Sequence, residues 1–221
     1  MAGRGTASRR RKPAGPAARH RTAPLAGAAA AADPLDDQII DAALALAARN
    51  GWRAANLPAI AAAAGVGLGA LYERFPDKPA ILVAVIRRVD RAMLASGGDE
   101  PAEGSPRDRL FDVIMRRFEA LQPLRPAIAA VVAAGADPLS AARLLGAGLR
   151  SLAWMLEAAG IDSSGVAGRL RIAGLAVVYA RAFRAWLDDD GADLGKTMAA
   201  LDRALAQAER WAGALPAAGS A

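Results

Sequence analysis

Residues 56–78 restrict the fold of this chain more than any other part of the sequence. Asn56 is a favoured helix N-cap residue, and Pro58 suits a first helical turn, where its missing N–H is not needed. Gly65 suits the left-handed conformation that ends a helix and reverses the chain. A second short segment, residues 68–75, then precedes a proline. The pattern predicts two short helices joined by a turn, a helix-turn-helix whose second helix can enter the DNA major groove.

Helical periodicity continues on both sides of this motif. Apolar residues recur at helical spacing up to Asn50, after an acidic start at residues 33–37. Trp52 is expected to pack beneath the motif, and Asp77 can cap a further helix over residues 78–96. The glycine- and proline-rich residues 97–106 then predict a boundary between two helical units.

The second half of the chain has the same helical character. It has long apolar segments with few aromatic residues, and Ala and Leu supply most of the bulk, which favours packed helices over sheets. Residues 188–191 (DDDG) predict an exposed turn before the last helix. Helices are expected over residues 107–121, 127–134, 138–159, 166–187 and 193–215. The sequence therefore predicts an all-α protein with a helix-turn-helix domain at 33–96, a linker at 97–106 and a second helical domain at 107–215.

The net charge of +6 is located at the N-terminus. Residues 1–32 hold seven cations and no acid, whereas the remaining 21 cations face 22 acids. We expect a disordered basic tail at 1–32 and a short disordered tail at 216–221. The basic tail adds sequence-independent attraction to phosphates, or acts only as a solubilising extension. Its composition also resembles a signal or transit peptide, an alternative that stays open.

Several function classes are disfavoured. The chain has no Cys, and its only His, His20, lies in the basic tail, which argues against disulfides, thiolate metal sites and imidazole catalysis. The uncharged run at 54–72 contains Asn56 and Pro58, so we expect no stable membrane insertion. Gly65, Gly67 and Ala70 match a dinucleotide-binding fingerprint, but a helix rather than a strand precedes them. We expect no catalytic activity, no metal and no cofactor.

The motif carries a family resemblance. Ala64-Gly65-Val66, Gly69, Leu71-Tyr72, Phe75 and Lys78 together resemble the DNA-binding signature of TetR-type transcriptional regulators. The resemblance implies binding to double-stranded DNA in the cytoplasm, dimerisation through the last two helices, and control by a small ligand in the larger domain. It also implies that Tyr72 and Lys78 meet the DNA backbone, and Arg53 and Arg74 can add phosphate contacts. The predicted DNA-binding residues are Arg53, Asn56, Gly67, Leu68, Gly69, Ala70, Tyr72, Arg74 and Lys78.

A second resemblance supports an alternative. Residues 107–128, 144–161 and 175–205 are similar to the ubiquinone-biosynthesis lipid-binding proteins that share the TetR fold. That resemblance implies a lipid-binding accessory protein that does not bind DNA. The helix-turn-helix region, residues 36–94, has seven cations against six acids, a small excess for a DNA-binding face.

In both cases the ligand is expected inside the second unit. A mostly apolar cavity suits a hydrophobic ligand or lipid, although the same large side chains can simply fill the core. The predicted pocket residues are Trp154, Met155, Tyr179, Phe183 and Trp186.

Overall fold

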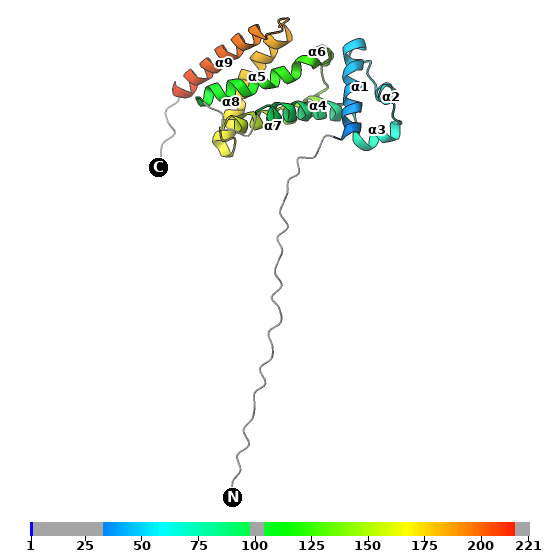
Figure 1. Cartoon of the computed structure of the whole chain (residues 1–221), viewed down its shortest axis with the longest axis horizontal. Helices are drawn as coiled ribbons and strands as arrows, with labels where there is room; N and C mark the ends of the chain where they lie inside the picture. Colours follow the sequence, from blue (N-terminus) through cyan, green and yellow to red (C-terminus); the bar gives the residue numbers. More distant parts are fainter. Residues whose placement is uncertain (2–32, 98–103, 215–221) are drawn as a thin grey trace. The chain divides into compact units, whose positions relative to one another are not determined.

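The computed structural model describes Met1 and residues 33–97 and 104–214, with side chains up to residue 210. In these residues the secondary structure is helical (Figure 1). The helices are α1 (Pro34–Asn50), α2 (Leu57–Ala63), α3 (Leu68–Arg74), α4 (Lys78–Ala95), α5 (Pro106–Leu121), a 3₁₀ turn η1 (Gln122–Leu124), α6 (Arg125–Ala134), α7 (Pro138–Ala158), α8 (Gly165–Leu187) and α9 (Gly195–Ala214). The all-α prediction is confirmed, while the predicted basic tail, apart from Met1, and the predicted tail at 216–221 lie outside the described residues.

Local capping bonds define the helix-turn-helix. The side chain of Asn56 accepts a hydrogen bond from the Ala59 N–H at 2.9 Å, and the side chain of Asp77 accepts one from the Ala80 N–H at 2.8 Å. Each bond satisfies an N–H that the first turn of the helix leaves without an intrahelical partner. Gly65 has φ +65°, which only glycine adopts without strain, and the chain reverses there. The predicted start of α2, its turn and the cap of α4 are confirmed.

The small side chains of α2 let it pack closely on the core. Ile60, Ala61 and Ala64 are buried, and Leu71 of α3 is fully buried beside them. Trp52 is also buried, as predicted, and joins the same apolar cluster as the inner face of α1. The three N-terminal helices are therefore held by one small core.

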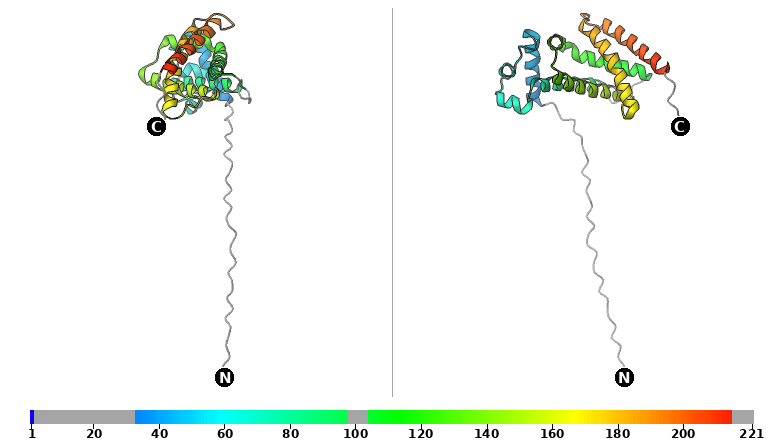
Figure 2. Two further views of the ribbon diagram at one scale, coloured as in Figure 1. Left: turned by 90° about the vertical axis from the view of Figure 1, so that its left-hand side faces the viewer. Right: turned by 180° about the vertical axis from the view of Figure 1, so that it is seen from behind.

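α4 connects this core to the rest of the chain. It packs against α5 and α7, and α1 packs against α6, so apolar contacts continue from one half to the other. Two views place α2 and α3 at one end of these helices and α9 at the opposite end (Figures 1 and 2). The predicted domain boundary falls partly on residues outside the described range, and the division into two domains stays a prediction.

Two details of the C-terminal half differ from the sequence prediction. α6 begins at Arg125 rather than at 127, because Pro126 fits the first turn of a helix. The turn at 188–191 is not fully exposed, since Asp189 is only 1% exposed. Its carboxylate accepts hydrogen bonds from the Thr197 N–H at 2.9 Å and the Thr197 hydroxyl at 2.8 Å. Asp189 therefore anchors the first turn of α9.

Among the described residues, no helix combines the length and the apolarity that crossing a bilayer demands.

Candidate nucleic-acid interface

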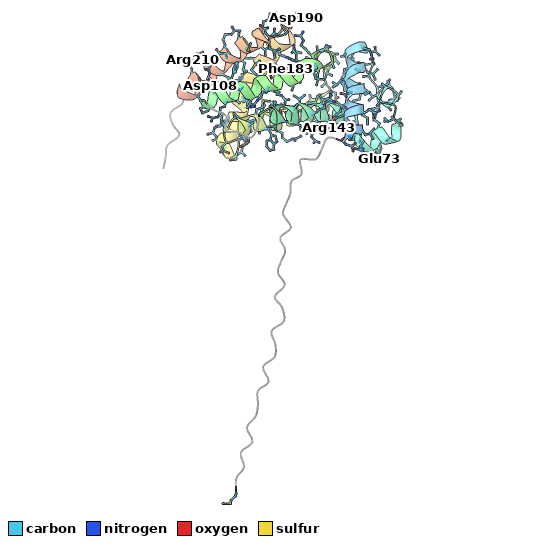
Figure 3. All side chains as sticks on the ribbon, in the orientation of Figure 1. Glu73, Asp108, Arg143, Phe183, Asp190 and Arg210 are labelled. Carbon is cyan, nitrogen blue, oxygen red and sulfur yellow. The ribbon has the colours of Figure 1, made fainter. Side chains whose placement is uncertain are left out.

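The outer face of α3 is the exposed surface of the helix-turn-helix. Tyr72 is 66% exposed and Leu68 is 52% exposed, whereas Leu71 between them faces the core. Gly69 and Ala70 of α3 and its N-cap residue Gly67 are also exposed, and Cβ atoms built at the two glycines meet open space. Glu73 lies at the outer end of α3 (Figure 3). A ligand can thus approach the backbone of α3 closely.

Arg74, at the end of α3, is paired within the protein. Its guanidinium forms ion pairs with Asp33 and, at 3.0 Å, with Asp36, both at the start of α1. The hydrogen bond from Arg74 lowers the pKa of Asp33, and the same bond raises the pKa of Arg74. The pairs are exposed and therefore weak. Any phosphate contact of Arg74 competes with these two carboxylates.

Lys78 also makes an internal contact. Its ammonium group donates a hydrogen bond to the Trp52 carbonyl at 2.6 Å and lies 4.4 Å from the centroid of the Trp52 ring. Burial lowers the pKa of Lys78, because a less hydrated site disfavours the charged form. Lys78 thereby links the start of α4 to the segment after α1.

Arg53 points toward the C-terminal half. Its guanidinium donates two hydrogen bonds, at 3.2 and 2.9 Å, to the carbonyl of Ala134, the last residue of α6. A cation is favourable at that position, because the carbonyl end of a helix is electronegative. A second link joins Arg143 of α7, labelled in Figure 3, to Asp77, the cap of α4. Sequence reasoning missed both long-range pairs.

The structure therefore divides the predicted DNA-binding residues into two groups. Asn56 is used as a helix cap, and Arg53, Arg74 and Lys78 contact other parts of the protein. The predicted residues that remain exposed, on α3 and at its N-cap, are Gly67, Leu68, Gly69, Ala70 and Tyr72.

The predicted ligand-pocket residues are also divided. Tyr179, Phe183 and Trp186 of α8 stack in series with Phe118 of α5, with ring centroids 5.3–6.0 Å apart. Met155 of α7 is fully buried. Stacked rings at this spacing fill space and attract one another, as in a packed core.

Trp154 does not join these rings. It is 57% exposed, on the outer surface of α7. The indole N–H of Trp186 donates a hydrogen bond to the side chain of Gln122 at 2.9 Å, so this buried polar group is satisfied.

A buried polar cluster lies against the stacked rings. Arg117 of α5 is 5% exposed and forms an ion pair with Asp90 of α4. Its Nε donates to the Tyr179 hydroxyl at 3.0 Å, and the Ser151 hydroxyl of α7 donates to Asp90 at 2.6 Å. Burial raises the pKa of Tyr179. The cluster joins four helices, including α4, which leads to the helix-turn-helix.

The sequence analysis did not predict this cluster, although the position of Arg117 in the sequence points to it. Arg117 occupies a core position in the helical pattern between Ile114 and Leu121. A charged residue at such a position is informative, because it is rarely buried without a partner. The sequence does not identify Asp90 as that partner.

A family model for bacterial regulatory proteins of the tetR family matches residues 39–85. The HTH-type transcriptional repressor KstR of Rhodococcus jostii is 34% identical over 85 residues, covering 38% of this chain and 40% of the relative. KstR of Mycolicibacterium smegmatis is 40% identical over 93 residues, covering 38% and 42%. The chain thus spans about two fifths of the length of these curated relatives.

Solved structures extend the similarity to most of the described helices. A TetR transcriptional regulator from Nitrosomonas europaea has a TM-score of 0.67 and 26% identity, covering 80% of this chain and 99% of that one. FadR of Bacillus subtilis, solved in complex with stearoyl-CoA, has a TM-score of 0.54 and 21% identity, covering 78% and 96%. At that identity FadR shows the shared fold alone.

Proposed function

We propose that this chain, whose residues 39–85 match the tetR family model and whose fold is that of a solved TetR regulator, is a transcriptional repressor. The observation that carries the proposal is the exposed α3, which is held between two capped helices and has an open outer surface. The second helix of a helix-turn-helix reads the major groove with side chains that face outward. In this chain those side chains are Leu68 and Tyr72. A regulator of this kind acts in the cytoplasm, where bacterial DNA lies.

The proposed contacts with DNA have two sources. The Tyr72 hydroxyl can donate to a phosphate, and the apolar Leu68 can contact a thymine methyl group. All three cations among the predicted DNA-binding residues are engaged within the protein. We therefore assign much of the attraction to phosphates to the basic residues 1–32 and to exposed arginines such as Arg49.

We further propose that the protein acts as a homodimer through α8 and α9. These helices pack against each other, and both carry large apolar side chains that are exposed in the single chain. Those that are at least a third exposed are Val166, Leu170, Val177 and Met198. A two-fold dimer presents two copies of α3 to two half-sites about one helical turn of DNA apart, or a multiple of it.

A hydrophobic ligand is proposed to control DNA binding. The contacts of Arg53 with Ala134, Arg143 with Asp77 and Arg117 with Asp90 connect the C-terminal helices to α4 and to the helix-turn-helix. A ligand that prefers one arrangement of these helices shifts the population toward dimers with one spacing of their DNA-binding domains. The similarity in fold to FadR, which was solved with stearoyl-CoA, supports an apolar ligand.

One observation favours the second candidate, a lipid-binding accessory protein. Arg53, Arg74 and Lys78 are all engaged within the protein, which leaves α3 without a free cation of its own among the described residues. On that account the helix-turn-helix is a structural remnant. The two candidates differ in one property, sequence-selective binding of DNA.

Selection of binding sites from a random-sequence duplex library tests the proposal. We expect the full-length protein to enrich a two-fold symmetric sequence, and the variant Tyr72→Ala to lose that enrichment. Enrichment of no sequence by the wild-type protein would overturn the repressor and favour the accessory protein.

A further inference from the structure

Glu73 lies on the side of α3 that faces away from the core. A helix turns by about 100° per residue, so Glu73 lies about 200° around the axis from Leu71, the buried residue of this helix. Gly69, four residues earlier, lies on the same outward face, and a Cβ built there meets open space. The exposed Glu73, labelled in Figure 3, therefore projects from the protein beside a stretch of backbone that DNA can approach closely.

Among the described residues, the Glu73 carboxylate has no hydrogen-bond or ion-pair partner. The cation next to it in sequence, Arg74, is paired with Asp33 and Asp36 at the start of α1. The negative charge of Glu73 is therefore not neutralised by its neighbour on α3.

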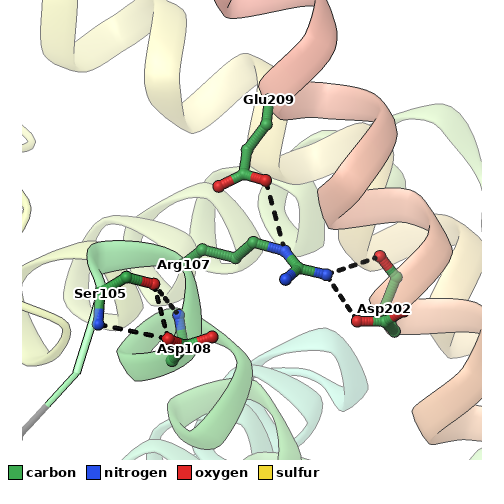
Figure 4. Close-up of polar contacts among 5 residues, drawn as sticks. All are labelled: Ser105, Arg107, Asp108, Asp202 and Glu209. Carbon is green, nitrogen blue, oxygen red and sulfur yellow. Dashed lines mark hydrogen bonds and ion pairs between the residues drawn. The ribbon is translucent and has the colours of Figure 1, made fainter.

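Two other glutamates show the contacts that a structural role requires. Glu157 accepts a hydrogen bond from the Ser163 N–H at 2.8 Å, and Glu209 forms an ion pair with Arg107 at 3.4 Å (Figure 4). An exposed carboxylate without such contacts is usually only solvated. On a face that approaches DNA, however, a carboxylate loses water, which is costly unless a hydrogen-bond donor replaces it. Glu73 therefore needs a donor from the DNA.

The bases differ in what they offer a carboxylate in the major groove. A carboxylate only accepts hydrogen bonds. Guanine presents two acceptors there, and thymine presents an acceptor and a methyl group, so neither donates to it. Adenine presents a donor beside an acceptor, whereas cytosine presents a donor alone. Cytosine is therefore the base whose edge fits a carboxylate best.

We propose that Glu73 selects a C·G base pair at one position of each half-site, by accepting a hydrogen bond from the N4 amino group of cytosine. The inference rests on the repressor proposed above and adds a polar base contact to the contacts of Leu68 and Tyr72. The acceptors of guanine and thymine repel the same carboxylate. Glu73 thus contributes to specificity more than to affinity, because it disfavours the wrong bases as well as binding the right one.

Substitution of Glu73 tests the inference by a change of base preference. Glutamine has a donor beside an acceptor and matches the adenine edge, whereas alanine forms no hydrogen bond with any base. In sites selected from a random-sequence duplex library, we expect Glu73→Gln to replace C·G by A·T at one position of each half-site. Glu73→Ala should show no preference there, and the other positions should be unchanged in both variants.

Glu119→Gln is the matched control, because it makes the same change at an exposed position of α5. Its selected sites should be those of the wild type. Glutamate, glutamine and alanine all favour helices, so we expect α3 to remain intact, and thermal unfolding of each variant confirms that it is folded.

Fluorescence anisotropy then gives the affinities for two duplexes, the wild-type site and the same site with A·T in place of the selected C·G pairs. The readout is the ratio of the two affinities, because removal of a negative charge beside DNA strengthens binding to both duplexes alike. We expect the wild type to prefer the C·G duplex at least about tenfold, and Glu73→Gln to prefer the A·T duplex.

Three results would overturn the inference. The first is selection of the wild-type bases at every position by both Glu73 variants. The second is an equal gain in affinity for both duplexes with an unchanged ratio, which would restrict Glu73 to repulsion of phosphates. The third is a wild-type preference for a base other than cytosine at the position that responds to Glu73. Enrichment of no sequence by the wild type would overturn the repressor as well, so the two failures are distinguished.

Discussion

Lys78 matches the DNA-binding signature in sequence, yet its side chain contacts another part of the protein. The sequence predicts a contact with the DNA backbone, whereas the structure places its ammonium 2.6 Å from the Trp52 carbonyl and over the indole ring. Tyr72, from the same signature, is exposed and lies on the outer face of α3. The two residues are therefore expected to respond differently to substitution.

We expect Lys78→Met to lower the free energy of unfolding by about 1–3 kcal/mol, because it removes a hydrogen bond from a charged group to a partly buried carbonyl. Tyr72→Ala should change stability by no more than about 0.5 kcal/mol, as is usual for exposed positions, while weakening DNA binding. Urea unfolding and fluorescence-anisotropy titration of both variants make the comparison. Unchanged stability in Lys78→Met would show that its contact with Trp52 contributes little.

A contact of Arg53 with DNA can be distinguished from its contact with the protein by experiment. If Arg53 bound a phosphate, its loss would reduce the slope of log affinity against log salt by about 0.9. Because both of its hydrogen bonds are made to the Ala134 carbonyl, we expect Arg53→Gln to leave that slope unchanged. A slope lower by about 0.9 would assign Arg53 to the DNA interface instead.

The pair formed by Arg117 and Asp90 is expected to dominate the polar contributions to stability. Arg117→Met leaves the largely buried Asp90, whose side chain is 15% exposed, without its ion-pair partner, which should cost about 3 kcal/mol. The double variant Arg117→Met/Asp90→Leu should recover most of that loss, because neither charge then remains. Arg91→Met, at an exposed position on α4, is the control. A double variant as unstable as Arg117→Met alone would contradict this account.

At the level of the helices, the helix-turn-helix could be predicted because its capping and turn residues act on neighbours in the sequence. Asn56, Gly65 and Asp77 act on residues two to four positions away, and they define the helix-turn-helix as predicted. The predicted start of α6 at residue 127 is two residues late, because Pro126 is accepted in the first turn of the helix. The prediction of an exposed turn at 188–191 is wrong for Asp189, because its partner, Thr197, lies on the next helix.

The anchor of α9 should depend on pH. Burial alone would raise the pKa of Asp189, but hydrogen bonds from the side chain and backbone of Thr197 outweigh it, and the pKa falls below its ordinary value of 3.8. Its contribution to stability is therefore complete above pH 3.8 and is lost as pH falls through the folded-state pKa.

Asp189→Asn should accordingly lower stability at pH 7 and flatten the loss of stability as the pH falls below 3.8. Urea unfolding across this range measures both effects, with Asp188→Asn at an exposed position as the control. An equally steep loss in wild type and Asp189→Asn would show that Asp189 is not the titrating group.

At the level of the whole molecule, sequence reasoning reached the fold but not the links between its parts. The periodic apolar faces predicted the helices, and the signature at 64–78 predicted the domain that the tetR family model matches. The contacts of Arg53 with Ala134 and of Arg143 with Asp77 span 81 and 66 residues along the chain, and no local pattern identifies such partners.

The central claim is that this protein recognises a DNA sequence through α3. The most direct test is a fluorescence-anisotropy titration of the full-length protein against the DNA upstream of its own gene and against a scrambled duplex, at several salt concentrations. We predict tighter binding to the upstream duplex, persisting at salt concentrations that suppress binding to the scrambled one, and loss of that preference in Tyr72→Ala. Equal affinity for both duplexes at every salt concentration would contradict the account.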